Sequence, residues 1–174
     1  MFINNRVTRF AIALAGYPAL FLVILFGCTS TESAVRKVRN NFEDGIAVTQ
    51  LPLPASHPQE VIAAWIIGDR SEPAGYALRL RAESRSGYFI ALVILNPELT
   101  IKDLAVEQYI GERGGEIRSE KFRSQFRGKS SLADLRIGND IDAVTGATIS
   151  SKALTKAVRK CLRWISSFLP DTGR

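Results

Sequence analysis

The sequence predicts an α+β domain, in which a curved, half-barrel-like antiparallel sheet is packed by a C-terminal amphipathic helix and preceded by an N-terminal membrane anchor or signal. Three observations lead to this expectation. Strand-like apolar segments follow one another with short turns between them, as in an antiparallel meander. The segment after residue 150 has apolar residues at helical spacing. An uncharged apolar stretch stands near the N-terminus, behind two arginines.

The composition fits one compact domain with a targeting segment. The chain has 174 residues, of which 46% are hydrophobic, and this argues against disorder. The formal net charge of +6 suits a domain near an anionic lipid surface or a phosphate group. Aromatic and basic residues do not interleave as on a nucleic-acid reading surface, so nucleic-acid binding is not expected. The single histidine, His57, stands in a proline-rich run, which argues against metal-centred or Ser-His-Asp chemistry.

The N-terminal segment predicts attachment to a membrane. Phe10–Gly27 holds no charge, and Arg6 and Arg9 precede it, which favours a cytoplasmic N-terminus and export of the rest. One interpretation is a retained single-span anchor, although the stretch is barely long enough. The other is the cleaved signal of a bacterial lipoprotein, with Cys28 as the acylated residue. Both place the folded domain on the extracytoplasmic, periplasmic side of a bacterial cell membrane.

The chain divides into three expected regions. These are residues 1–28 as signal, lipoprotein signal or membrane anchor, residues 29–58 as juxtamembrane helix and linker, and residues 59–174 as the folded domain. In the second region, Ser33–Asn41 is polar with valines at helical spacing. Leu51–Pro58 has the proline-rich composition of a linker.

The middle of the chain predicts strands. The apolar run Val61–Ile67 fits either a buried strand or a short helix, and its periodicity does not decide between them. Tyr76–Ala82 alternates apolar and polar residues, Tyr88–Leu95 is a dense apolar strand, and Thr100–Tyr109 is a third candidate. Because the turns between these three are short, we expect antiparallel pairing. A short helical piece is expected at Phe122–Phe126.

The C-terminal segment predicts an amphipathic helix that begins near Ser151 and packs on the sheet. Its apolar stripe consists of Leu154, Ala157, Val158, Cys161, Leu162, Ile165, Phe168 and Leu169. Its opposite side consists of Lys152, Lys156, Arg159, Lys160 and Arg163. Because Cys161 falls on the apolar stripe, we expect a core thiol there and no disulfide with Cys28.

The loop before this helix, within residues 142–151, carries the strongest functional signal. One interpretation is helix capping, in which Thr148, Ser150 or Ser151 binds the free amides of the first turn. Another is phosphate binding, because helix N-termini attract anions and Gly146 lets the backbone approach a ligand closely. The GxxxxGK[ST] spacing of a Walker loop is missing.

Residues 142–148 read Asp-x-x-Thr-Gly-Ala-Thr, and Ser151 follows them. This run resembles the flavinylation motif of the FMN-binding domain family. The family includes the FMN-carrying subunits of the Na+-translocating NADH:quinone reductase and of Rnf complexes, together with stand-alone membrane-associated proteins. The resemblance spans roughly Gly75–Leu162. It implies that Thr148 carries FMN through a phosphoester bond made by a separate flavin transferase.

The resemblance also implies a set of cofactor-binding residues. They are Asp142, Thr145, Gly146, Ala147, Thr148, Ser151, Lys152 and Glu112. Glu112 aligns with the glutamate of a Glu-Thr-Pro-Gly stretch in the pump subunits, and a solvated loop carboxylate is the equal alternative. Lys152, one turn into the helix, is expected to contact the phosphate. Tyr88, Tyr109 and Trp65 are candidates for ring contact, although core packing is the more expected role of each.

The expected function is that of a membrane-tethered electron carrier with covalent FMN. A threonine hydroxyl is a weak nucleophile, and no activating base stands near Thr148 in the sequence, so a flavin transferase is expected to load it. The other expected partners are membrane or extracytoplasmic redox proteins and membrane lipid. The GxGxxG dinucleotide fingerprint is missing, so independent catalytic turnover is not expected. A non-redox regulatory or maturation lipoprotein on the same fold is the alternative.

Overall fold

The computed structural model describes residues 31–43, 45–85 and 87–169. The expected signal or anchor and the candidate lipidation site Cys28 lie outside the described residues. Within the described part of the chain, no helix combines the length and the apolar character that a membrane span requires.

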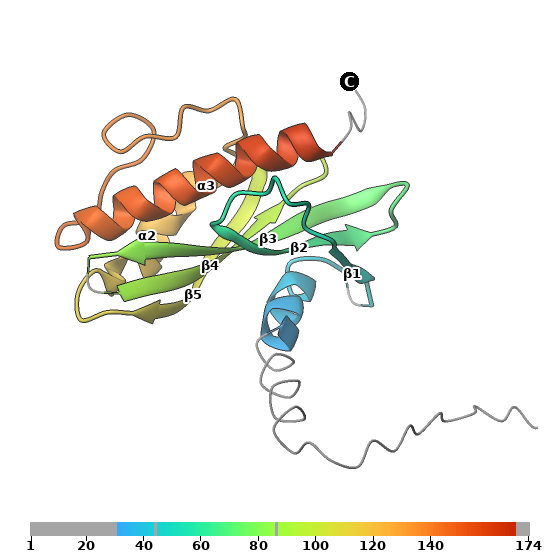
Figure 1. The fold of residues 1–174 in the computed structure, drawn as a ribbon, viewed down its shortest axis with the longest axis horizontal. Helices are drawn as coiled ribbons and strands as arrows, with labels where there is room; N and C mark the ends of the chain where they lie inside the picture. Colours follow the sequence, from blue (N-terminus) through green and yellow to red (C-terminus); the bar gives the residue numbers. More distant parts are fainter. Residues whose placement is uncertain (1–30, 44, 86, 170–174) are drawn as a thin grey trace, which may run out of the picture. The chain divides into compact units, whose positions relative to one another are not determined.

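The sheet lies in the compact unit Ala34–Arg174. It is one open antiparallel sheet whose five strands follow one another in sequence order (Figure 1). The strands are β1 (Val48–Leu51), β2 (Val61–Gly68), β3 (Pro73–Ser84), β4 (Gly87–Leu95) and β5 (Ile101–Ile110). The α+β class and the antiparallel meander are therefore confirmed. The ambiguous run Val61–Ile67 is a strand, and β1 is an additional strand that the sequence did not indicate.

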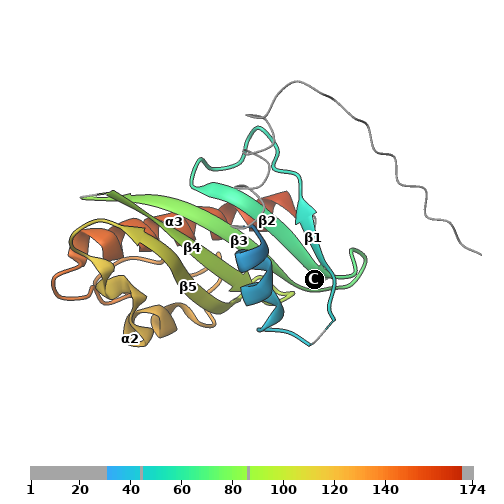
Figure 2. The ribbon, with the colours of Figure 1, turned by 90° about the horizontal axis from the view of Figure 1, so that it is seen from below.

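Helical segments follow the sheet in the described chain. They are η1 (Gly115–Arg118), α2 (Glu120–Arg123), η2 (Ser124–Phe126) and α3 (Thr148–Phe168). The expected helical piece is confirmed, and the rings of Phe122 and Phe126 meet there edge to face with centroids 5.5 Å apart. The C-terminal helix is confirmed too, but it begins at Thr148 rather than near Ser151. It crosses one face of the sheet, as Figures 1 and 2 show.

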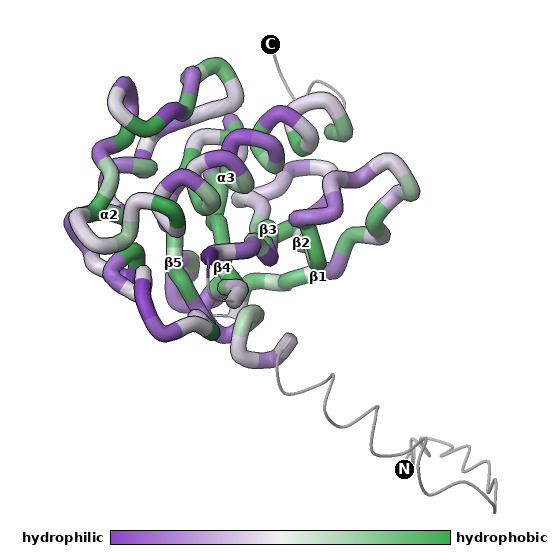
Figure 3. Tube along the Cα trace, turned by 60° about the vertical axis from the view of Figure 1, so that its left-hand side comes forward, coloured by the Kyte–Doolittle hydropathy of each residue, from purple (hydrophilic) through white to green (hydrophobic). Residues whose placement is uncertain are grey.

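The face of the sheet under α3 carries the larger apolar core. The alternation in β3 sends Tyr76, Leu78 and Leu80 to this face, where the apolar stripe of α3 meets them. Along α3, hydrophilic and hydrophobic residues alternate in Figure 3, as an amphipathic helix requires. Cys161 is 1% exposed, and burial raises the pKa of its thiol, so the predicted core thiol is confirmed.

The opposite face is covered by helical residues 34–39, within the segment where a short helix was expected. Ala34 and Val38 of this helix pack against Trp65 and Leu92 of the sheet. Figure 2 shows this helix, in blue, and α3, in red, on opposite sides of the strands. The interior strand β4 is thus apolar on both of its faces, which explains its dense hydrophobic run.

A bulge in β5 brings a charge to this second face. Ile90 pairs with Gln108 and Ala91 with Val106, which leaves Glu107 as an extra residue between them. The side chain of Glu107 is 6% exposed. One carboxylate oxygen accepts from Arg79 Nε at 2.8 Å, and the other lies 3.6 Å from Lys37 Nζ without a hydrogen bond. Glu107 of β5 thus links Arg79 of β3 with Lys37 of the helix that covers this face.

Candidate functional site

The predicted motif loop ends in a tight turn that presents a hydroxyl. Ala147 N donates to Val144 O at 3.0 Å, and Gly146 adopts a φ of +83° that favours glycine. Ala147 is buried, whereas Thr148 is exposed as the first residue of α3. The turn therefore anchors the residue before Thr148 and leaves the threonine accessible.

The next two hydroxyls face inward and fasten this turn. Ser151 is fully buried, and its Oγ donates to Ala147 O at 2.9 Å and accepts from Val144 N at 3.2 Å. Ser150 is 3% exposed, and its Oγ lies 2.9 Å from Tyr109 Oη. The capping interpretation is wrong, because no side chain caps α3 and Ala147 stands at its N-cap. The hydroxyls are used by the loop and the sheet, so the first-turn amides lack a side-chain partner.

Tyr109 joins three parts of the chain at this point. Its hydroxyl donates to Arg113 O and lies 3.4 Å from Ser84 Oγ, in addition to the contact with Ser150. Gly114 fits beside this cluster with a φ of +100°, and a Cβ at Gly114 would collide with Ser150 Oγ and Tyr109 Oη. The loop after β5 is thereby held against the start of α3.

The tyrosine thus has a positioning role, and its ring stacks on Phe89 at a centroid distance of 6.0 Å. Of the other two aromatic candidates, Trp65 packs on the opposite face of the sheet and therefore does not reach this site. Tyr88 lies under the guanidinium of Arg81, whose Cζ is 4.3 Å from the ring centroid. Core or surface packing describes each of the three.

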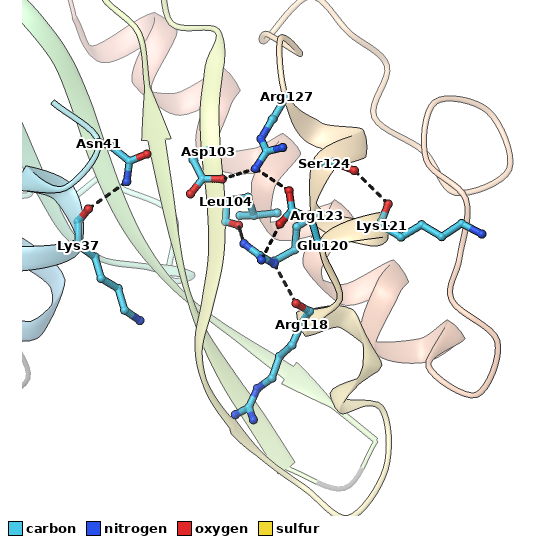
Figure 4. A network of polar contacts seen from close by, with 10 residues as sticks. All are labelled: Lys37, Asn41, Asp103, Leu104, Arg118, Glu120, Lys121, Arg123, Ser124 and Arg127. Carbon is cyan, nitrogen blue, oxygen red and sulfur yellow. Dashed lines mark hydrogen bonds and ion pairs between the residues drawn. The ribbon is translucent and has the colours of Figure 1, made fainter.

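A second clamp holds the loop at its beginning. Asp142 N donates to Gln125 Oε1 at 2.7 Å, and Gln125 Nε2 donates to Asp142 O at 3.3 Å. Gln125 lies on η2, and the α2–η2 segment is fixed to β5 by the network in Figure 4. In that network Arg123 donates to Leu104 O at 2.7 Å, and Arg127 donates to Asp103 at 3.3 Å. The sequence predicted Asp142 as a site residue. In the structure it is the backbone of Asp142 that forms the two hydrogen bonds with Gln125.

A cavity of about 550 Å³ opens beside Thr148. It is lined by Arg85, Glu112, Arg113, Gly114, Gly146, Ala147, Thr148, Ile149 and Ser150. Four of the eight predicted residues, Gly146, Ala147, Thr148 and Glu112, therefore meet at this cavity, and Glu112 joins them from a distant loop. Asp142, Thr145 and Ser151 are not part of its lining.

Lys152 does not line this cavity either. It lines a second hollow of about 230 Å³ together with Leu135, Arg136, Ile137, Thr155, Lys156 and Arg159. The cations of the first cavity are instead Arg85, from the β3–β4 turn, and Arg113, from the loop after β5. Neither arginine was predicted from the sequence. Their only sequence signal is a basic residue beside a glycine-containing turn, which is too common to single them out.

The charge around Thr148 favours an anion. In the cavity lining, Arg85 and Arg113 oppose the carboxylate of Glu112, and none of the three forms an ion pair with another described residue. A second carboxylate, Glu116, lies close by, with its Oε1 3.6 Å from the place of a Cβ at Gly146. The first turn of α3 contains no acidic residue. Its partial positive charge therefore adds to that of the two guanidinium groups.

The fold and this cavity define a small α+β ligand-binding domain. Residues 86–163 match the family described as the FMN-binding domain. The chain is also similar to one subunit of the proton-translocating ferredoxin:NAD(+) oxidoreductase complex of Clostridium ljungdahlii, at 28% identity over 100 residues. That match covers 53% of this chain and 54% of the relative, so the chain spans about half of the length of this relative. The predicted family resemblance is confirmed.

Proposed function

We propose that Thr148 carries FMN through a phosphoester bond and that the protein is a membrane-tethered electron carrier. In this proposal a flavin transferase loads the threonine, and membrane or extracytoplasmic redox proteins exchange electrons with the flavin. The name of the similar protein, which belongs to an oxidoreductase complex, supports the redox part of the proposal.

The observation that carries the proposal is the exposed residue Thr148 beside a cavity of about 550 Å³. Cavities that hold cofactors measure about 300–1,000 Å³, so the space fits a flavin. Gly146 and Ala147 add little bulk next to the threonine, which leaves room for a loading enzyme. The cavity lining contains no histidine that could activate the hydroxyl, in keeping with loading by another protein.

The residues of the cavity have separable roles in this proposal. Arg85 and Arg113 would bind the phosphodiester charge, aided by the free amides at the start of α3. The carboxylate of Glu112 would repel any further anionic group from the cavity. Tyr109 and Gly114 would keep the loop after β5 in place beside the cavity. Bound FMN would accept and release one or two electrons, while the protein supplies its position and its electrostatic surroundings.

The decisive experiment is the intact mass of the full chain co-produced with a bacterial flavin transferase. We expect an FMN-sized increment in the wild type that is lost in Thr148→Ala. The matched control is Thr49→Ala, an exposed threonine of β1 that does not line the cavity, which should keep the increment. A colourless wild type without the increment would favour the non-redox regulatory or maturation role, and an increment that persists in Thr148→Ala would refute this attachment site.

The tether is a separate part of the proposal. We place it at residues 1–28, as a single-span anchor or as a lipoprotein signal processed at Cys28, with the domain on the periplasmic side. Labelling of cells with radioactive palmitate tests the second form, because Cys28→Ser should abolish label in the protein. A wild type that is unlabelled and keeps residue 1 would support the single-span anchor. Release of the wild type into the soluble fraction would refute both the anchor and the lipoprotein form.

A further inference from the structure

The exposed side of α3 carries one row of cations. Lys152, Lys156, Arg159 and Arg163 follow one another at intervals of four, three and four residues, which places them on one side of a helix. Thr148 stands one turn before Lys152 on the same side. At about 1.5 Å per residue, the row with Thr148 at its head is about 22 Å long. The whole helix contains no aspartate or glutamate.

Most of this charge is not neutralised by close ion pairs among the described residues, although Glu60 lies near enough to be affected by the charge of Lys156. Lys152, Lys156 and Arg163 form no ion pair within 4.0 Å there, and Arg159 only approaches Asp134, at 3.9 Å. The remaining cation of the helix, Lys160, lies beside the row and pairs with Glu60. A solvated helix surface usually carries both signs of charge. A row of cations without interspersed anions instead creates a positive potential along this side of the helix.

The row borders a hollow that a partner side chain could enter. This second hollow, of about 230 Å³, lies between α3 and the segment 135–137. Its lining combines the cations Lys152, Lys156 and Arg159 with the apolar residues Leu135 and Ile137. Small pockets with an apolar part and a charged rim are typical anchor points of protein interfaces.

A protein partner explains the row better than a bilayer does. A helix that binds a membrane surface inserts its apolar face between the lipids. The apolar face of α3 is already buried against the sheet, as Leu154, Val158 and Ile165 are each fully buried. What is left for a partner is charge around a shallow hollow, which suits a brief, salt-sensitive protein encounter.

We propose that this cationic row, made of Lys152, Lys156, Arg159 and Arg163, is the docking surface for an acidic redox protein. The proposal rests on the electron-carrier function, since it is the flavin at Thr148 that would bring a redox partner to the head of the row. The row would orient the acidic partner so that its redox centre lies close to the start of α3. Binding would be weak and would fall steeply as salt is added.

The test measures binding of an acidic haem protein, the soluble domain of cytochrome b5, to the full chain held in neutral phosphatidylcholine nanodiscs. The variant Lys152→Glu/Lys156→Glu is compared with Arg118→Glu/Lys121→Glu, which changes the net charge equally at exposed positions outside the row. At low salt we expect the row variant to bind at least about tenfold more weakly and the control variant to stay within about twofold of wild type. Folding should persist, because Lys152 and Lys156 are both exposed and surface substitutions usually change stability little.

Three outcomes overturn the docking proposal. They are no binding of cytochrome b5 by the wild type, equal losses in both variants, or a row variant that loses binding to phosphatidylglycerol vesicles while it keeps cytochrome b5. The chain is assayed without FMN, so this result is independent of the mass measurement at Thr148. Basic cytochrome c serves as the opposite probe and should bind the row variant at least as well as the wild type.

Discussion

The two faces of the sheet bury polar groups in different ways. Under α3 the buried polar residues are hydroxyls, Ser150, Ser151 and Thr155, each joined to a neighbour by a neutral hydrogen bond. On the opposite face the bulge of β5 buries the carboxylate of Glu107 against Arg79. The charges of the α3 side stay at its surface. One face therefore uses charge to hold the fold together, whereas the other leaves its charge at the surface.

The largest expected effect is on the face with the buried charge. Glu107→Ala removes the carboxylate that Arg79 and Lys37 share, and loss of one partner of a buried ion pair costs about 3–5 kcal/mol. Because Lys37 is half exposed, we expect a decrease in the free energy of unfolding of about 3 kcal/mol. Urea unfolding followed by circular dichroism measures it.

The matched control is Glu83→Ala, which breaks an exposed pair with Arg81 and should cost less than about 1 kcal/mol. Loading of Thr148 should be unchanged in folded Glu107→Ala, since the two sites lie on opposite faces. A cost for Glu107→Ala no greater than that of Glu83→Ala would refute the structural role of the buried charge.

The next effect is at the tyrosine cluster on the α3 side. In Gly114→Ala the new Cβ would collide with Ser150 Oγ and Tyr109 Oη, and its φ of +100° strains any L-residue. We expect a decrease in the free energy of unfolding of about 2 kcal/mol, together with less FMN incorporation by mass spectrometry, because the loop after β5 must move. Gly128→Ala is the control, since it has a φ of +74° but open space. Equal effects of the two substitutions would show that the backbone conformation alone matters.

A smaller effect should separate phosphate binding from ring binding in the cavity. In the chain before flavin loading, Arg113→Ala and Arg85→Ala should each weaken binding of free FMN about tenfold, or about 1.4 kcal/mol. Riboflavin lacks the phosphate, so its affinity should hardly change. Fluorescence titration measures both ligands, and Arg118→Ala outside the cavity is the control. Equal losses for FMN and riboflavin would contradict a role in phosphate binding.

Much of this fold follows from local pattern. The alternation in Tyr76–Ala82 and the apolar spacing of α3 predict which side of each element faces the core. Both predictions are confirmed. The strand β1 has four residues with only one buried, too few to show a period of two. Val61–Ile67 has no usable period because it is buried on both faces, and only pairing with β3 decides its conformation.

The site was predicted less completely, for a reason of distance along the chain. The motif residues Gly146, Ala147 and Thr148 are contiguous, so their place at the start of a helix could be predicted. The partner of Ser150 is Tyr109, 41 residues away, and the cavity cations come from two separate turns. Hydroxyl residues near the start of a helix predict capping, because capping is a local interaction. In the structure the Ser150 hydroxyl contacts the distant Tyr109 instead.

The smallest effect concerns Lys160, which of the α3 cations lies closest to a carboxylate of the described residues. Burial of Glu60 alone would raise the pKa of its carboxyl, but the hydrogen bond from Lys160 and the charges of Lys160 and Lys156 outweigh burial and lower it. A lowered pKa in the folded state means that stability is present above the unfolded pKa and is lost as the pH falls through the folded one. Because the pair lies near solvent, we expect only about 0.5 kcal/mol, lost between about pH 5 and pH 3. Glu60→Gln should remove this part of the pH dependence of the free energy of unfolding, and Glu98→Gln should not. If the wild type and Glu60→Gln gave identical pH profiles, Lys160 would be as unopposed as the row beside it, and the docking surface would have to include it.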